Sequence, residues 1–271
     1  MKKTLLSISA LFALSAGIVQ ADTSLRYHYD FEKISGTGSG TAAAVNYNLA
    51  ENPGTGMWTA TPQWVGWTGG ALGSNFAFNC PGGGAKLTLQ GSGPNNSLGV
   101  NTTDGFSMSF FVKDNGSAQY ANMFQLNSSN GNRIFSQKDS GDASTPGSWQ
   151  FYSGTQSGLD GWKGTTVPMT GFAHIALTFQ NGTLQVYRDG TQFLNATGVN
   201  FSGELTSIAL TPGGTAAFDE FALYSGVLNQ EEITYLASHS AKDFTVPEPA
   251  TATLGLAGLA LLSLRRRRRD A

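Results

Sequence analysis

The fold is decided by residues 172–194, which read FAHIALTFQNGTLQVYRDGTQFL. Hydrophobic residues alternate along 172–180, and a period of two is typical of a strand with one buried face. Asn181-Gly182 and Asp189-Gly190 are dipeptides favoured in two-residue type I′ hairpin loops. The segment therefore predicts three antiparallel strands joined by two tight turns.

The two turns also predict the register of these strands. A two-residue loop at Asn181-Gly182 pairs Gln180 with Thr183, and the second loop pairs Arg188 with Thr191. Val186 then lies opposite Phe193, and directly opposed residues share one face of a sheet. The residues expected on the buried face are Leu177, Phe179, Leu184, Val186 and Phe193.

Similar short segments separated by turn dipeptides occur along the rest of the body. Further strands are expected at 25–31, 106–112, 121–127, 133–137, 149–153, 205–211 and 217–224. A helix is expected from Asn229 to Ser238, because Asn229 and Glu232 have the spacing of a capping box. This pattern predicts one all-β domain, a two-sheet antiparallel sandwich with one short C-terminal helix. Within the first expected strand, one face would carry Leu25, Tyr27, Tyr29 and Phe31.

The two ends of the chain have a different character from the body. Lys2 and Lys3 precede an apolar run, and Val19 and Ala21 place small residues before a cut at Asp22, which is the layout of a secretory signal peptide. An uncleaved membrane anchor is the alternative. Near the other end, residues 250–264 carry no charge, and as a helix they would span about 22 Å. A hydrocarbon core is about 30 Å thick, so this tail would need flanking arginines that reach the interface.

The C-terminal tail resembles a PEP-CTERM sorting signal of Gram-negative bacteria. The resemblance implies recognition by an exosortase, insertion in the inner membrane during sorting, and then a place at the cell surface or in the extracellular matrix. A plain C-terminal anchor is the alternative. The arginines would stay cytoplasmic by the positive-inside rule. The residues of the signal are Val246, Pro247, Glu248, Pro249, the apolar run 250–264, and Arg265, Arg266, Arg267, Arg268 and Arg269.

Composition excludes several classes of protein. Of the 271 residues, 40% are hydrophobic and 13% are charged, against a usual charged share of roughly 25%. Seven of the 16 basic and two of the 18 acidic residues lie in the two ends, so the body 22–245 has nine basic and 16 acidic residues and a net charge of −7. A nucleic-acid-binding protein usually has a basic face, so no nucleic-acid partner is expected.

The body resembles a LamG-like or concanavalin A-like jelly roll. The matching segments are Phe106–Lys113, Phe172–Phe179 with Leu184–Gly190, and Phe218–Tyr224 with Leu228–Ile233, while Tyr29–Glu32 fits the opening strand. The resemblance divides the chain into a signal peptide 1–21, a domain 22–240, a linker 241–249, a membrane segment 250–264 and an Arg-rich tail 265–271. Residues 36–84 follow no clear family pattern.

Catalytic patterns are largely absent from the sequence. Glycoside hydrolysis needs two carboxylates near the scissile bond, but no Glu-x-Asp-x-x-Glu run occurs. Asp30 and Glu32 have a spacing of two without a third carboxylate, and the neighbours Asp219 and Glu220 should point to opposite faces of a strand. No Gly-x-Ser-x-Gly motif is present. The sequence therefore predicts that the protein is not an enzyme.

Metal-binding patterns are also sparse. His28, His174 and His239 lie far apart and Cys80 is the only cysteine, so neither a zinc site nor an internal disulfide is expected. His174 should be structural, and Cys80 a buried or idle thiol. LamG-like domains often carry a calcium ion at the rim, which leaves two interpretations of four loop residues as calcium ligands or plain turn formers: Asp114, Asn115, Asp139 and Asp142.

Aromatic residues supply the remaining candidates for a binding site. Aromatic side chains are favoured anchors at binding surfaces, and the alternative is that they cover the core of the sandwich. The candidates are Trp58, Trp64, Trp67, Trp149, Tyr152 and Trp162. The leading hypothesis is an exported, non-enzymatic module that binds carbohydrate or a surface protein. A purely structural envelope or matrix protein and a carbohydrate-active enzyme are the alternatives.

Overall fold

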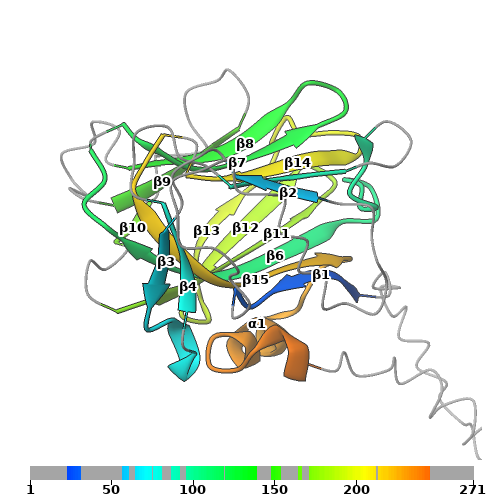
Figure 1. Ribbon diagram of the computed structural model, residues 1–271. Coiled ribbons are helices and arrows are strands. Elements are labelled where there is room, and N and C mark those ends of the chain that lie inside the picture. Colours follow the sequence, from blue (N-terminus) through cyan, green and yellow to red (C-terminus); the bar gives the residue numbers. More distant parts are fainter. Residues whose placement is uncertain are drawn as a thin grey trace, which may run out of the picture.

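The computed structural model describes residues 23–31, 57–60, 65–74, 76–80, 87–91, 96–118, 120–138, 148–153, 164–166, 171–211 and 213–244. In this part of the chain two antiparallel sheets are packed face to face, as Figure 1 shows. The predicted two-sheet jelly-roll sandwich is therefore confirmed. The predicted signal peptide and the tail beyond residue 244 lie outside the described residues.

Sheet A has the strand order β13-β12-β11-β6-β15-β4-β3, with β1 paired to β15. The strands are β1 (Ser24–Tyr29), β3 (Val65–Thr68), β4 (Phe76–Cys80), β6 (Phe106–Asp114), β11 (Ala173–Gln180), β12 (Thr183–Arg188), β13 (Thr191–Ala196) and β15 (Ala216–Ser225). The strands β13, β12 and β11 are consecutive in the sequence, whereas the pairs β11-β6, β6-β15, β15-β4 and β1-β15 join distant segments.

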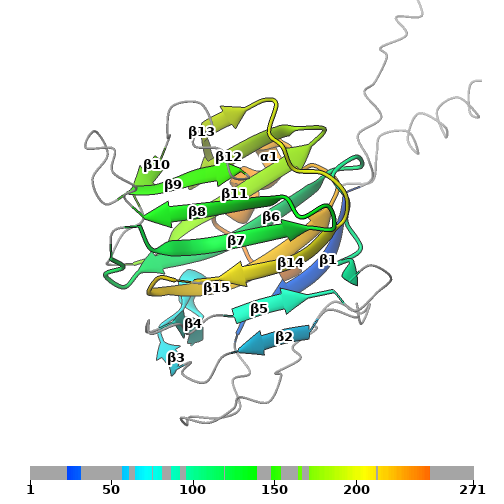
Figure 2. The same ribbon diagram turned by 90° about the horizontal axis from the view of Figure 1, so that it is seen from above.

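Sheet B has the order β10-β9-β8-β7-β14-β5-β2, which can be followed in Figure 2. The strands are β2 (Met57–Ala60), β5 (Leu87–Gln90), β7 (Asn122–Ser128), β8 (Arg133–Lys138), β9 (Ser148–Ser153), β10 (Gly164–Thr166) and β14 (Leu205–Leu210). The helical elements are η1 (Ala71–Gly73), α1 (Gln230–Leu236) and η3 (Ala241–Asp243).

The predicted hairpin forms β11 and β12 with the expected register. Gln180 lies opposite Thr183 and Phe179 opposite Leu184. Asn181 and Gly182 both have positive φ, at 47° and 77°, as a type I′ turn requires. The local turn chemistry was therefore sufficient to predict this pairing.

The register of the second hairpin differs from the prediction beyond its turn. Arg188 pairs with Thr191 as expected, but Val186 lies opposite Leu194 and not Phe193. A bulge between Val186 and Tyr187 inserts one extra residue in β13, which shifts every later pair by one. Phe193 is partly buried and packs against Phe151 of sheet B, with 5.7 Å between ring centroids.

The prediction that Leu25, Tyr27 and Tyr29 share one face of β1 is wrong for Leu25, because a second bulge interrupts this strand. The pairing of β1 with β15 shifts between Leu25 and Tyr27. Tyr27 and Tyr29 consequently belong to the core between the sheets, whereas Leu25 packs on the opposite side of sheet A.

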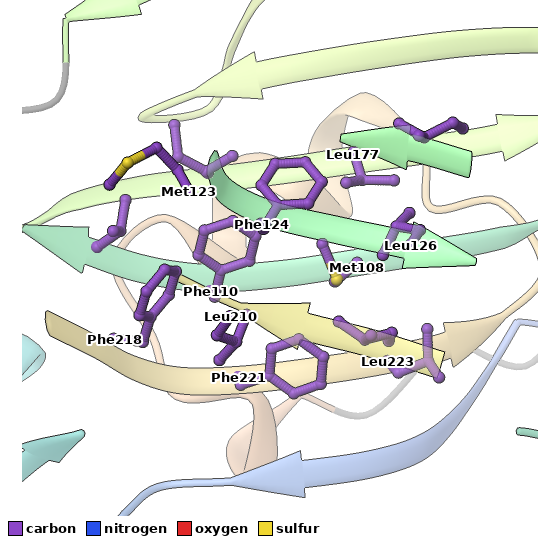
Figure 3. Close-up of a cluster of buried hydrophobic side chains, with 14 of the residues drawn as sticks. Met108, Phe110, Met123, Phe124, Leu126, Leu177, Leu210, Phe218, Phe221 and Leu223 are labelled. Atoms are coloured by element: carbon purple, nitrogen blue, oxygen red, sulfur yellow. The ribbon is translucent and has the colours of Figure 1, made fainter. Parts of the chain in front are cut away.

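The core lies between the two sheets and is rich in aromatic residues. Phe110 of β6 contacts Phe124, Phe218 and Phe221 in the centre of the cluster (Figure 3). The described strands thus bury side chains from both sheets against each other, as the alternating sequence pattern requires.

The predicted helix is α1, and its capping box is present. The side chain of Asn229 accepts hydrogen bonds from the backbone N–H groups of Glu231 and Glu232, and Glu232 accepts from the Asn229 N–H. Ile233 and Leu236 are buried against sheet A. Within the described residues, no helix is long and apolar enough to cross a membrane.

Candidate functional site

Part of the outer face of sheet A is covered by helical elements. Figure 1 shows α1 on the side of sheet A that faces away from sheet B. A second apolar cluster fills this contact, and its members are Ala176, Tyr187, Ala222, Tyr224, Leu228, Ile233, Leu236 and Ala241. This covered part of sheet A therefore offers no surface to a ligand.

The outer face of sheet B is not covered by any described helix (Figures 1 and 2). It carries polar and aromatic side chains. The register brings Gln125 opposite Phe135, and Asn127 opposite both Arg133 and Ser207. Arg133 is exposed and the other four are half-buried. We call this surface the sheet B face, with the residues Gln90, Gln125, Asn127, Arg133, Phe135 and Ser207.

A chain of side-chain hydrogen bonds crosses the sheet B face. Gln125 Nε2 donates to Asn127 Oδ1 at 2.7 Å, and Asn127 Nδ2 donates to Ser207 Oγ at 2.9 Å. Next to this chain, the guanidinium carbon of Arg133 lies 4.7 Å from the ring centroid of Phe135. The polar groups are held in defined positions beside an aromatic ring.

Such an arrangement suits a ligand that carries hydroxyl groups on an apolar ring. A hydroxyl both donates and accepts, and a primary amide offers both an N–H donor and a carbonyl acceptor. An aromatic side chain contributes a flat apolar surface with little conformational freedom to lose. The face therefore offers fixed amide donors and acceptors beside an aromatic ring.

The predicted role of Trp149 as an exposed binding residue is wrong. Trp149 is fully buried in β9, and its ring lies 6.3 Å from that of Phe218 between the sheets. It occupies an inward position of the strand, so the alternative interpretation, that it fills the core, holds for this residue.

The other predicted aromatic residues stay predictions. Trp64 and Trp162 lie outside the described residues. Trp58 pairs with Leu89 in sheet B, and Trp67 pairs with Ala77 in sheet A, but their side chains are outside the described part. The backbone of Tyr152 pairs with Phe135, which places this position beside the sheet B face.

The amide and arginine residues of the sheet B face were not among the residues predicted to bind a ligand. Gln125, Asn127 and Arg133 belong to strands that were expected, at alternate positions along them. That alternation was a usable signal for their outward direction. It did not show that β7 and β8 are neighbours, or that their outer side is open.

The expectation that Asp219 and Glu220 point to opposite faces is corrected by a bulge. The pairing of β15 with β6 shifts between Asp219 and Ala222, and Glu220 has φ of 49°. Asp219 accepts hydrogen bonds from the Ala71 N–H and the Ser74 hydroxyl. Ser74 and Glu220 line the same cavity, so the extra residue brings both carboxylates toward one side.

The carboxylates of Asp219 and Glu220 form hydrogen bonds to segments that pack around β15. Glu220 Oε2 lies 2.8 Å from His28 Nε2 and accepts from Ser240 Oγ at 2.6 Å. Burial raises the pKa of Asp219 to about 7, against the opposing effect of the hydrogen bonds from Ser74 and two backbone N–H groups. Burial also acts to raise the pKa of Glu220, but hydrogen bonds from His28 and Ser240 outweigh it and lower that pKa. The pair therefore connects β1, η1 and η3 to β15.

For the other carboxylate pair considered in the sequence, Asp30 and Glu32, the structure describes only Asp30. Asp30 is buried just after the end of β1, and Glu32 lies outside the described residues. Cys80 is buried in β4, as predicted. Burial raises the pKa of its thiol to about 12, partly offset by a hydrogen bond with Thr211, so it is protonated at neutral pH.

His174 is buried on the outward side of β11. Its Nε2 lies 2.8 Å from Ser109 Oγ, and its ring lies 5.1 Å from that of Phe111. Neither Ser109 nor His174 is exposed by more than 3%, so this pair is enclosed in the fold. Burial lowers the pKa of His174 to about 4, with a smaller opposing effect of Asp189.

The depressed pKa of His174 predicts a loss of stability in acid. The folded protein binds fewer protons than the unfolded chain between pH 6.5 and pH 4, so this contribution to stability is present above pH 6.5 and is lost as the pH falls through this range. We expect urea unfolding of the wild type to lose about 2–3 kcal/mol from this residue between pH 7 and pH 4.5. His174→Gln keeps a hydrogen-bonding partner for Ser109 and should lack this loss.

Comparing the two proteins isolates His174, because other titrating groups are common to both. Asp219, whose pKa is raised, favours the folded state at low pH and loses this effect as the pH rises toward 7. If His174→Gln lost as much stability on acidification as the wild type, the assignment to His174 would be wrong.

Two of the four loop residues considered for calcium, Asp114 and Asn115, have protein partners in the structure. Asp114 Oδ2 lies 2.8 Å from Lys138 Nζ, and Oδ1 accepts from the backbone N–H groups of Gly116 and Ser117. Asn115 donates to Asn79, while Asp139 and Asp142 lie outside the described residues. The Asp114 carboxylate is thus engaged by protein donors. In the described ranges, no three His, Cys, Asp or Glu residues are grouped as a metal site.

Comparison with known proteins agrees with the architecture. A model of the concanavalin A-like lectin/glucanases superfamily matches residues 81–234, which is more than half of the chain. The model of the PEP-CTERM protein-sorting motif matches residues 245–269, and this motif implies processing by an exosortase. No curated protein matches the chain.

Two solved structures show the similarity of fold. Domain 4 of AbnA, a GH43 extracellular arabinanase from Geobacillus stearothermophilus in complex with arabinotriose, is 19% identical with a TM-score of 0.55, covering 79% of this chain and 98% of that domain. A mutant of Trypanosoma rangeli sialidase displaying trans-sialidase activity is 13% identical with a TM-score of 0.51, covering 69% of this chain and 30% of the sialidase. At these identities the likeness concerns the fold alone.

The sandwich, its strand order and the two matched models lead to one assignment. The chain belongs to the concanavalin A-like lectin/glucanases superfamily and carries a C-terminal PEP-CTERM protein-sorting motif.

Proposed function

We propose that this protein is an exported, non-enzymatic module that binds carbohydrate through the sheet B face. The observation that carries the proposal is the hydrogen-bonded chain from Gln125 through Asn127 to Ser207, which runs beside Phe135 on a face without a covering helix. On the outer face of sheet A, part of the surface is taken up by the packing of α1 and η3.

The dimensions of the sheet B face favour an extended ligand. Neighbouring strands lie about 4.8 Å apart, so the distance from β8 across β7 and β14 to β5 is about 14 Å. Gln90 of β5 continues the row that begins at Arg133 and passes through Asn127 and Ser207. A row of alternating donors and acceptors at this spacing suits an oligosaccharide better than a single sugar.

The sorting motif supports the location of this activity. We infer that the chain enters the export pathway through the signal peptide 1–21 and inserts the tail 250–264 in the inner membrane during sorting. An exosortase then processes it near Pro247-Glu248-Pro249, and the body reaches the cell surface or the extracellular matrix. The fold of AbnA domain 4, which was solved with arabinotriose, is compatible with this activity, but the proposal rests on the side chains of this chain.

A glycan array with the purified full-length chain tests the proposal. Phe135→Ala removes the aromatic surface, and Asn127→Ala interrupts the hydrogen-bond chain. We expect each to weaken binding about tenfold, which corresponds to about 1.4 kcal/mol. Tyr152→Ala should act in the same direction if the backbone pairing with Phe135 brings it to the ligand.

Asn195→Ala is the matched control, because Asn195 is an exposed strand residue of sheet A. Circular dichroism of each variant verifies that the fold is retained. Binding that is equally strong in Phe135→Ala, Asn127→Ala and wild type would exclude the sheet B face as the site. A folded protein that binds no glycan would favour the structural matrix role. Release of reducing sugar would identify an enzyme instead.

A further inference from the structure

Arg133 is the one charged residue at the outward positions of the sheet B strands, within the part of the chain that the structure describes. The other outward positions given by the register of β5, β7, β8 and β14 carry Thr, Gln, Asn, Ser, Ala or Phe. Arg133 is exposed at the start of β8, and none of the three ion pairs among the described residues includes it. Among the described outward residues of these strands, Arg133 is therefore a single positive charge between neutral side chains.

The contact between Arg133 and Phe135 orients the guanidinium group without consuming its hydrogen bonds. The guanidinium carbon lies 4.7 Å from the centroid of the ring. An arginine that stacks on an aromatic face uses the plane of its guanidinium group, while its N–H donors point outward in that plane. The side chain is thus held beside the ring, and as an exposed group its guanidinium keeps N–H donors accessible to a ligand.

The chemistry that matches this fork of N–H donors is a carboxylate. Arginine binds carboxylates through two parallel N–H···O bonds, and these charge-assisted bonds are roughly twice as strong as neutral ones. Asn127 lies directly across the ladder from Arg133, and Asn132 precedes it in the chain and accepts from Ser202 Oγ at 3.2 Å. Hydroxyl groups on the same sugar would find amide partners on either side of the arginine.

We propose that Arg133 recognises the carboxylate of an acidic sugar, so that the ligand of the sheet B face is a polysaccharide containing uronic acid. This inference rests on the carbohydrate-binding function proposed above and specifies its substrate class. The body 22–245 has a net charge of −7, which opposes polyanions at long range. At physiological ionic strength this repulsion is screened beyond about 8 Å, so a local pair with Arg133 decides the specificity.

The probes are alginate, polygalacturonate and polyglucuronate, each compared with its methyl-esterified form, which keeps the sugar backbone and removes the charge. The full-length wild type should bind at least one carboxylated polymer about tenfold more tightly than its ester. Arg133→Gln should lower that affinity by about 10- to 100-fold, as expected for hydrogen bonds to a charged group, and leave the ester unaffected. Arg133→Lys keeps the charge without the fork and should fall between these values.

Arg26→Gln is the control, because Arg26 is an exposed strand residue of sheet A and its replacement removes the same charge. It should bind every probe like the wild type. Equal weakening of acid and ester in Arg133→Gln would overturn the proposal, since Arg133 would then only support Phe135. Binding of neutral glycans without preference for any acid would also overturn it and leave the proposed function intact. No binding of neutral or acidic glycans by folded protein would reject both.

Discussion

Replacing Lys138 by Met is expected to destabilise the fold by about 3–5 kcal/mol, as measured by urea unfolding at pH 7. The Lys138 ammonium lies 2.8 Å from Asp114 Oδ2, and the two side chains are exposed by only 14% and 1%. Without the lysine, the Asp114 carboxylate keeps its neutral N–H donors but no cation. A buried charge that loses its counter-ion costs far more than a surface ion pair contributes.

A double-mutant cycle tests whether this cost arises from the buried charge. Asp114→Asn keeps an acceptor for the N–H groups of Gly116 and Ser117, and removes the charge. The double variant should therefore be more stable than the sum of the single losses predicts, by about 1–3 kcal/mol. Arg26→Met removes a positive charge from an exposed position and should cost within about 0.5 kcal/mol. Strictly additive losses would show that Lys138 acts only by packing.

Phe110→Ala is expected to cost about 3–5 kcal/mol of unfolding free energy. The ring of Phe110 is fully buried, and its centroid lies 5.5 Å from that of Phe218 and 6.0 Å from that of Phe124 (Figure 3). Truncation leaves a cavity that strands β6, β7 and β15 close only in part. Phe110→Leu fills most of that volume and should cost less.

Phe135→Ala is the matched comparison for this prediction. Phe135 is also a strand phenylalanine, but it is half-buried on the outer side of sheet B. It should cost at most about 1 kcal/mol, because its truncation opens no enclosed cavity. A loss as large as that of Phe110→Ala would mean that Phe135 is a structural residue, which would also weaken the case for the sheet B face.

Local patterns predicted the parts of the fold that depend on neighbouring residues. The turn at Asn181-Gly182 needs positive φ at two successive positions, which Asn and Gly adopt readily, and the strand register follows from the loop length. The capping box at Asn229 and Glu232 likewise begins α1 where the sequence predicts. Both features are formed by residues that are close together in the sequence, so they could be predicted without knowing any long-range contact.

The bulges at Val186, Leu25 and Asp219 were not predictable in the same way. Each one depends on how two strands meet, and a single extra residue reverses the direction of the side chains that follow. For this reason Val186 pairs with Leu194 and not with Phe193, although Phe193 still packs against the core as expected. Leu25 lies on the opposite side of sheet A from Tyr27, and Asp219 and Glu220 line one side of the sheet.

By itself, the sequence determined the class of the fold, the central hairpin, the helix and the sorting motif, because turn chemistry and hydrophobic period are local properties. Only the tertiary structure decided which faces are open. Trp149 is turned into the core, while Arg133 and Phe135 meet Gln125 and Asn127 on a face that no described helix covers. The order of strands in a sheet and the packing of α1 on sheet A arise from long-range contacts, and these contacts separate a buried aromatic residue from an exposed one.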